Sequence, residues 1–264
     1  MRKLKAKDLN LDLTLSCGQV FRWNKDNEGC WHGFISGKIA KLRQSGNYLY
    51  FGGKACKADI VRYFNLGLNY RKILRSISKD PLIKKAVKKY HGLRIIKQDP
   101  FECLATYILS SQNNIPRINK MVNELSRKFG KKIEFKGREY YQFPTIQNLA
   151  GTCSADYHSC RLGFRNRYLE DAIKKLSAGE LKLDRLAKMP YQEAKTELLK
   201  VKGVGKKVAD CVLLFAYNKY EAFPVDRWIE RVMNKYYKGK DGSYFGKYAG
   251  YAQEFLYLFI RDPR

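Results

Sequence analysis

A change in hydrophobic periodicity near residues 52–53 divides this chain into two unlike parts. Before it, short runs of aromatic and β-branched residues alternate with turn-forming clusters such as Ser36-Gly37, which is typical of hairpin strands. After it, from about Asp59 onward, apolar residues recur at helical spacing, with Gly and Pro at the breaks. The pattern predicts an α+β fold in which a small antiparallel β-sheet precedes a mostly helical body.

The expected elements follow from these periodicities. We expect β structure through residues 11–55, with strands at 31–35, 39–42 and 48–51. Helices are expected over residues 59–76, 81–90, 100–111, 115–129, 145–150, 166–177, 181–188, 191–201, 206–217, 226–236 and 244–260. We expect two domains: residues 1–95 with the sheet and its flanking helices, and residues 96–264 with two helical lobes and a cleft between them.

The charge of the chain indicates a polyanionic partner. Lys and Arg number 52 against 25 Asp and Glu, which gives a formal net charge of +27. Basic side chains bind phosphates, and the aromatic residues, 14% of the chain, can stack on bases. The alternative is a generally Lys-rich protein, but surplus charge destabilises a compact fold and usually has a use. We therefore expect nucleic acid as the partner.

Cysteine, histidine and hydropathy patterns exclude several classes. The seven cysteines have no framework spacing, and Cys153 and Cys160 come nearest to a metal spacing without any CxxC pair. No Cys follows Cys211, so we expect no iron–sulfur cluster, and the three His form no metal signature. We expect no metal and no cofactor. Without a membrane-length apolar run or a signal peptide, we expect an intracellular, DNA-associated protein.

Residues 198–211 carry the most informative motif, in which a helix ends, Gly203-Val-Gly205 turns the chain, and a second helix begins. The glycines permit tight turns and a close approach to another chain. The amides that begin the second helix lack intrahelical partners, so they can hold a DNA phosphate. The segment predicts a helix–hairpin–helix, which grips the DNA backbone without reading sequence.

Lys207 and Asp226 add chemistry to this motif. Lys207 falls in the first turn of the second helix beside Lys206, and a nearby ammonium and the positive end of a helix favour the neutral amine that attacks carbon. One helix length later, Asp226 follows Phe-Pro-Val and begins a helix. The alternatives are a phosphate-binding lysine and a simple N-cap, and the cap is compatible with a carboxylate that stabilises positive charge on a sugar.

The segment GVGKKVADC followed by PVD resembles the helix–hairpin–helix glycosylase superfamily, and specifically the 8-oxoguanine DNA glycosylases with an N-terminal β domain. Four further blocks resemble the same family in the same order, so that the resemblance spans nearly the whole chain. They are CGQVFRW at 17–23, QDPFEC…SSQNNIPRI at 98–118, LGFRNRY at 162–168 and YAGYAQ at 248–253.

The resemblance implies a catalytic pair and a base pocket. Lys207 would be the nucleophile that attacks C1′ and leaves a Schiff base, with β-elimination of the strand, and Asp226 would stabilise the sugar cation. Gly18 would accept a bond from N7–H of the oxidised base through its carbonyl oxygen, and Gln253 would read the Watson–Crick edge. Tyr257 and Cys211 would form the two stacking walls.

The resemblance also implies contacts with double-stranded DNA. Asn113 would fill space near the vacated position, Phe164 would wedge the stack, and Arg117 and Arg165 would hold the orphaned base. Gln112, Asn114, Gly203, Gly205 and Lys206 complete the expected DNA-binding set. Taken singly, residues such as Cys211, Tyr257 and Gln253 fit a core, packing or surface role equally well.

Five positions depart from the family pattern. Lys202 replaces a hairpin Pro, which predicts a more mobile or more basic hairpin, and Gln112 replaces the first of three Asn. Phe164 replaces Tyr at the wedge, and Tyr257 replaces Phe at the wall. Trp228 replaces a phosphate-contacting His, and we expect this contact to be either lost or supplied by Arg227.

Three other functions remain to be weighed. A monofunctional alkylbase glycosylase does not need Lys207. A non-enzymatic DNA-binding module needs neither Lys207 nor Asp226, and an endonuclease III-like enzyme carries a cysteine cluster that is missing here. We therefore expect a monomeric enzyme that excises 8-oxoguanine from duplex DNA and has lyase activity.

Overall fold

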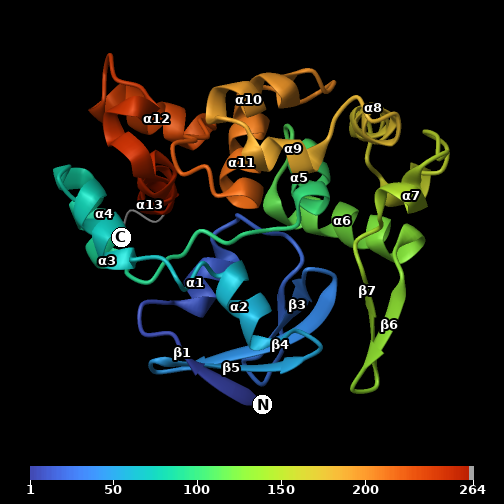
Figure 1. The fold of residues 1–264 in the computed structure, drawn as a ribbon, viewed down its shortest axis with the longest axis horizontal. Helices are drawn as coiled ribbons and strands as arrows, with labels where there is room; N and C mark the ends of the chain where they lie inside the picture. Colours follow the sequence, from blue (N-terminus) through green and yellow to red (C-terminus); the bar gives the residue numbers. More distant parts are fainter. Residues whose placement is uncertain (262–264) are drawn as a thin grey trace.

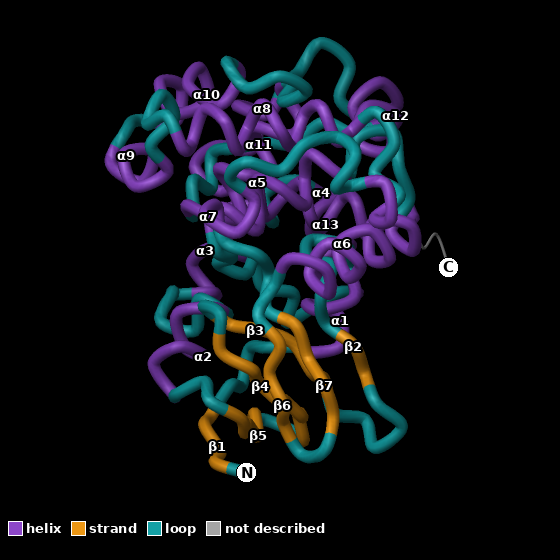
Figure 2. Tube along the Cα trace, turned by 90° about the vertical axis from the view of Figure 1, so that its right-hand side faces the viewer, coloured by secondary structure: helices purple, strands orange, loops and turns teal. Residues whose placement is uncertain are grey.

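A five-stranded antiparallel sheet forms the N-terminal part of the computed structural model, which describes residues 1–261 (Figures 1 and 2). The strand order is β1-β5-β4-β3-β2, which confirms the predicted sheet. The strands are β1 (Arg2–Lys5), β2 (Asn24–Lys25), β3 (Trp31–Ile35), β4 (Lys38–Ser45) and β5 (Tyr48–Gly53). Ser36 and Gly37 both have positive φ, as a two-residue hairpin turn requires.

Helix α1 (Leu11–Ser16) shows that the expectation of β structure through residues 11–55 is wrong at its start. The leucines at 11, 13 and 15 alternate along the chain as in a strand. The side chain of Asn10 nevertheless caps a helix by accepting a bond from the Leu13 amide at 3.0 Å. The helix buries Leu11, Thr14 and Leu15, which share one helical face.

The body that follows is mostly helical, as predicted. Its helices are α2 (Lys57–Tyr63), α3 (Tyr70–Ile77), α4 (Pro81–Lys89), α5 (Pro100–Leu109), α6 (Ile115–Phe129), α7 (Ile146–Leu149), α8 (Arg165–Ser177), α9 (Leu183–Lys188), α10 (Tyr191–Leu199), α11 (Lys206–Tyr217), α12 (Arg227–Tyr236) and α13 (Ala249–Arg261), with 3-10 segments at His158–Cys160 and Gly242–Tyr248. None of the helices within residues 1–261 has the length and apolarity that crossing a membrane requires.

Two of the expected helices are interrupted. The range 59–76 is two helices, because Asn65 adopts a left-handed conformation and its side-chain amide donates to the carbonyl of Ile95 at 2.9 Å. Asn69 then caps α3. The range 244–260 is broken at Gly246, whose φ is 68°, so that α13 begins only at Ala249.

The apolar interior has two cores. The smaller core lies under the sheet and includes Leu42, Phe51 and Ile60. The larger core joins the helices of the body, and it includes Tyr70 and Ile73 of α3. Helices α3 and α4 lie beside α13 (Figure 1), so this pair packs with the helical body although it precedes residue 95. The division of the chain after residue 95 stays a prediction.

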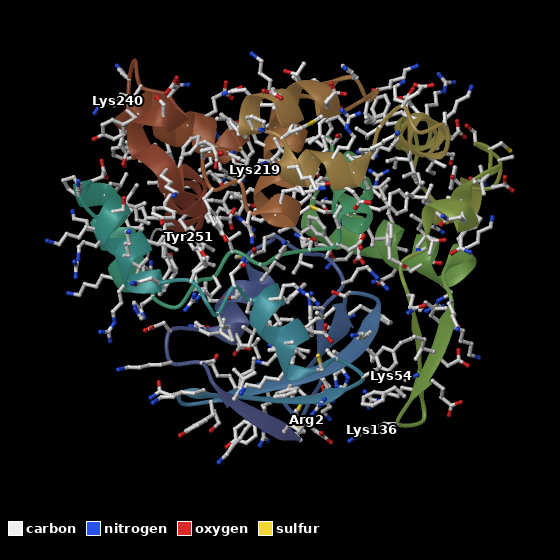
Figure 3. The ribbon with its side chains drawn as sticks, in the orientation of Figure 1. Arg2, Lys54, Lys136, Lys219, Lys240 and Tyr251 are labelled. Atoms are coloured by element: carbon white, nitrogen blue, oxygen red, sulfur yellow. The ribbon has the colours of Figure 1, made fainter. Side chains whose placement is uncertain are left out.

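A second hairpin, β6 (Lys132–Phe135) and β7 (Arg138–Tyr141), projects from between α6 and α7 toward the sheet (Figure 1). Tyr140 Oη and His32 Nδ1 lie 3.0 Å apart, and Arg22 donates to the carbonyl of Tyr141. This hairpin is not among the elements expected from the sequence. Lys136 at its tip and Lys240 near α12 lie on opposite sides of the molecule (Figure 3), so positive charge is spread over the surface.

Candidate active site

The hairpin between α10 and α11 makes the tight turn that its glycines predict. Gly203 has a φ of 80°, and a Cβ there would lie 2.3 Å from Cγ of the Tyr168 ring, so glycine is required. Gly205 is the N-cap of α11, and no side chain in the described part of the chain caps this helix start. The first amides of α11 are therefore available to an anion.

Lys202 explains how the hairpin tolerates the loss of the family's Pro. Its backbone amide donates to Oδ2 of Asp171 on α8 at 2.7 Å. Proline has no N–H and cannot make this bond. The hairpin therefore gains a hydrogen-bonded anchor to α8, which favours the more basic hairpin of the two expected outcomes over the more mobile one.

Lys207 and Asp226 face the same space from different helices. Lys207 is the second residue of α11 and is half-buried, and its Nζ lies 5.1 Å from the centroid of the Tyr107 ring. Asp226 is the N-cap of α12. Both residues line a cleft of about 930 Å³ and a smaller cavity of about 50 Å³. The structure thus brings the two expected catalytic groups together.

Asp226 caps its helix, as expected. Its Oδ1 accepts from the amides of Trp228 at 3.0 Å and Ile229 at 2.9 Å. Both capping bonds go to the same carboxylate oxygen, so the cap occupies only one of the two. A capping carboxylate that also lines the cavity fits both roles that the sequence suggests.

The smaller cavity also gathers the four residues expected to hold a base. Gly18 has a φ of 102°, and a Cβ there would lie 3.0 Å from Cδ1 of Ile115. Gln253 is buried, and its Oε1 has no hydrogen-bond partner among residues 1–261. Burial raises the pKa of Cys211 to about 12, against the lowering effect of Lys207, and burial raises the pKa of Tyr257 to about 12.

The loop between α5 and α6 lines the cleft, and its asparagines shape the loop itself. Asn113 donates to the carbonyl of Leu109 at 3.0 Å, and Asn114 caps α6 by accepting from the Arg117 amide at 3.0 Å. Gln112 has a left-handed backbone and an exposed side chain. Arg117 is exposed on the cleft wall, where a nucleic acid base could reach it.

Arg165 is placed differently from Arg117, because it is buried. Its Nε donates to the carbonyl of Ser111 at 2.8 Å, and its Nη2 donates to the carbonyl of Gln112 at 2.9 Å. Phe164 beside it is 48% exposed, and the guanidinium carbon of Arg165 lies 4.4 Å from the Phe164 ring centroid. Arg165 and Phe164 lie outside the residues that line the cleft, as does the exposed Lys206.

Two residues that the sequence analysis does not single out line the cavity. Tyr107 of α5 lies beside Lys207, and Glu254 of α13 lies next to Gln253. A sequence feature could have indicated Glu254, because it is the only charged residue in the stretch 249–260. No sequence feature indicated a role for Tyr107, since a tyrosine in a buried helix is ordinarily a packing residue.

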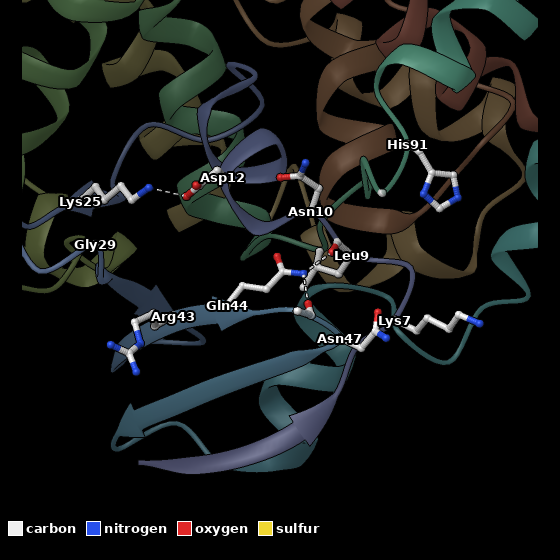
Figure 4. Close-up of a pocket in the computed structure, with 12 residues that line it drawn as sticks. Lys7, Leu9, Asn10, Asp12, Lys25, Gly29, Arg43, Gln44, Asn47 and His91 are labelled. Atoms are coloured by element: carbon white, nitrogen blue, oxygen red, sulfur yellow. Dashed lines mark hydrogen bonds and ion pairs between the residues drawn. The ribbon is translucent and has the colours of Figure 1, made fainter.

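The expected site residues are missing from two other places, a hollow beside the sheet and a group of potential metal ligands. A hollow of about 650 Å³ lies between α1 and the sheet (Figure 4), where Lys25 pairs with Asp12 at 2.8 Å. None of the expected site residues lines it. Asp26, Glu28 and Cys30 lie close enough to share a metal ion, but Asp26 is already bonded to His32 Nε2 at 2.7 Å. The cleft with Lys207 is therefore the candidate active site.

The helix–hairpin–helix lies beside a cleft that is lined by a lysine and an aspartate. This combination defines the class of helix–hairpin–helix proteins that repair DNA by base excision. Comparison with known families supports this class, because residues 105–244 match the HhH-GPD superfamily of base excision DNA repair proteins. Residues 2–104 match the N-terminal domain of 8-oxoguanine DNA glycosylase. The chain belongs to the 8-oxoguanine DNA glycosylase family.

Individual proteins agree with this assignment. The N-glycosylase/DNA lyase OGG1 of Arabidopsis thaliana is 29% identical over 97% of this chain and 78% of its own length. The structure of MBOgg1 with a low-affinity DNA ligand is 35% identical, with a TM-score of 0.93, over 98% of this chain and 94% of that one. The structure of the Clostridium acetobutylicum 8-oxoguanine glycosylase/lyase, bound to DNA with cytosine opposite 8-oxoguanine, is 36% identical. Its TM-score is 0.92, over 97% of this chain and 92% of that one.

Proposed function

We propose that this protein flips 8-oxoguanine out of duplex DNA, excises it, and then cleaves the strand at the resulting abasic site. The observation that carries the proposal is that Lys207 and Asp226 line one cavity together with Gly18, Cys211, Gln253 and Tyr257. DNA-bound relatives of the same fold support duplex DNA as the partner. Since one chain supplies the whole site, we propose that the protein acts as a monomer and is associated with DNA inside the cell.

The chemistry begins with the amine of Lys207. Its nitrogen forms a bond to C1′ of the flipped nucleotide as the C1′–N9 bond breaks, and the departing base takes the electron pair and a proton. The sugar ring opens to a Schiff base. Loss of a proton from C2′ then expels the 3′ phosphate. The free oxygen of Asp226 would stabilise the positive charge that the sugar develops on this path.

Recognition of the base would use polar and stacking groups that line the cavity. The carbonyl of Gly18 would accept from N7–H, which 8-oxoguanine has and guanine lacks. Gln253 has a buried Oε1 without a partner in the described chain, and a base N–H would satisfy it. Cys211 and Tyr257 come from α11 and α13 and would stack on the two faces of the base. Phe164, exposed at the start of α8, would fill the vacated stack.

A covalent trap tests the lysine. Borohydride should cross-link the protein to an 8-oxoguanine duplex, and Lys207→Gln should abolish both the cross-link and strand cleavage while DNA binding remains. Lys206→Gln is the matched control, because it removes the same charge from the exposed neighbour. It should still trap. Trapping by Lys207→Gln at the rate of the unaltered protein would place the nucleophile elsewhere.

A further inference from the structure

Glu254 is a buried carboxyl group to which the chemistry above gives no part. It lies on α13 between Gln253 and Tyr257 and lines the same cavity as Lys207. Only 5% of the residue is exposed, and its Oε2 accepts a weak bond from Cys17 Sγ at 3.8 Å. A polar group this deeply buried ordinarily has a strong partner or a ligand.

The groups around Glu254 favour its neutral form. Burial, together with the charge of Asp226, raises its pKa to about 8, against the lowering effects of Lys207 and of the bond from Cys17. The other titratable groups that feel it are Tyr107 from α5, Cys211 from α11 and Tyr257 from α13. Two carboxylates in a small cavity repel each other, so near neutral pH Glu254 keeps its proton.

We propose that Glu254, as a neutral carboxylic acid, hydrogen-bonds the flipped base and helps to select an oxidised purine. The inference rests on the proposed function. A carboxylic acid presents an O–H donor beside a C=O acceptor. At the lactam of C8 and N7, which guanine lacks, the oxidised purine presents C=O beside N–H, so the two edges match. A carboxylate can only accept, and it would repel the carbonyl oxygen of the base.

The test compares Glu254→Gln with the unaltered protein in single-turnover release of 8-oxoguanine between about pH 6 and pH 10. The amide keeps one donor and one acceptor but does not ionise. Above about pH 8 the rate of the unaltered protein, divided by that of the variant, should fall by up to about tenfold per pH unit. A ratio that stays constant with pH would overturn the proposal.

Cleavage of a preformed abasic duplex separates an effect on the base from an effect on Lys207, since no base enters the cavity there. The ratio for this reaction should not change with pH. A fall that matches the one for base release would overturn the proposal, because Glu254 would then act through the lysine. Glu230→Gln is the charge-matched control at the exposed rim of the cleft, and its ratio should stay flat for both reactions.

Glu254→Met covers the case in which Glu254→Gln does not fold. It keeps the length of the side chain and removes the donor, so base release should fall at every pH while cleavage of abasic DNA persists. Undiminished base release by this variant would also overturn the inference. Failure of the proposed function would look different: the unaltered protein would then release no 8-oxoguanine at any pH.

Discussion

The amino nitrogen of Lys207 lies 5.1 Å from the centre of the Tyr107 ring. That ring is itself held on two sides. It stacks on Phe215 of α11 with centroids 5.6 Å apart and an interplanar angle of 11°, and its hydroxyl donates to the carbonyl of Gln19 at 3.1 Å. An aromatic ring attracts an ammonium group over its face. Tyr107 therefore positions the amino group of the proposed nucleophile, Lys207, in the cavity.

Replacing Tyr107 should separate the ring from the hydroxyl. Tyr107→Phe keeps the ring, so single-turnover base release should stay close to normal, with a loss of about 1 kcal/mol in the free energy of unfolding from the missing hydrogen bond. Tyr107→Leu removes the support, and misplacement of the amine should slow borohydride trapping by about 10- to 100-fold. Equal trapping by both variants would show that the ring only fills space.

The carboxylate charge of Asp226 can be tested apart from its capping role. Asp226→Asn keeps a side-chain oxygen for the cap, so thermal stability should change little. Base release should fall by at least about tenfold if the charge stabilises the sugar cation. Asp99→Asn is the matched control, because Asp99 caps α5 with two similar bonds to Phe101 and Glu102 and lies outside the cavity. A fully active Asp226→Asn variant would reduce Asp226 to a cap.

Trp228 should report DNA binding through its fluorescence. It lines the cleft and is 40% exposed, whereas Trp23 and Trp31 are 7% and 8% exposed. Addition of undamaged duplex should quench the emission, and Trp228→Phe should remove most of the change. Because phosphate contacts carry the binding, the affinity from this titration should drop steeply as salt rises from about 50 to 200 mM. A flat salt response would contradict the interpretation of the +27 charge.

The two arginines near the α5–α6 loop should behave differently when removed. Arg117 is exposed on the cleft wall. Its guanidinium can donate to the two acceptors of cytosine, whereas adenine presents a donor amino group at the corresponding edge. We expect base release opposite cytosine to exceed that opposite adenine, and Arg117→Ala should flatten this preference. Equal release opposite all four bases by the unaltered protein would exclude such a check.

Arg165→Ala should act mainly on stability. Its guanidinium donates to the backbone carbonyls of Ser111 and Gln112, so its loss removes two charge-assisted hydrogen bonds and leaves partly buried acceptors unpaired. We expect a loss of about 3 kcal/mol or more in the free energy of unfolding, measured by denaturant titration. A stability within about 0.5 kcal/mol of normal would mean that this loop holds its shape without the arginine.

Much of the fold could be predicted because its signals are local. The helix–hairpin–helix glycines, the cap at Asp226 and the apolar periodicity of α11 depend on neighbours within one or two turns. Helix α1 was missed because its leucines alternate like a strand, although the side chain of Asn10 caps the helix by accepting from the Leu13 amide. The β6–β7 hairpin was missed because part of its support, such as the contact between Tyr140 and His32, comes from far away in the chain.

The base pocket was predictable only in part, for the same reason. Lys207 and Asp226 stand in recognisable segments, whereas the roles of Tyr107 and Glu254 depend on which helices meet. The structure also gives Arg165 contacts that no local pattern indicates, since its donors reach carbonyls more than 50 positions away. The spacing of residues in the sequence can therefore indicate which residue types occupy a site. Tertiary packing determines which of their atoms remain available to bind a ligand.

The contact between Cys17 and Glu254 joins positions 237 residues apart. The cavity thus draws lining residues from the segment that follows α1, such as Gly18, and from α13. Without α13 the cavity would lose Gln253, Glu254 and Tyr257. Damage recognition therefore depends on tertiary packing between distant parts of the described chain, so a destabilising change far from the cavity should also weaken it.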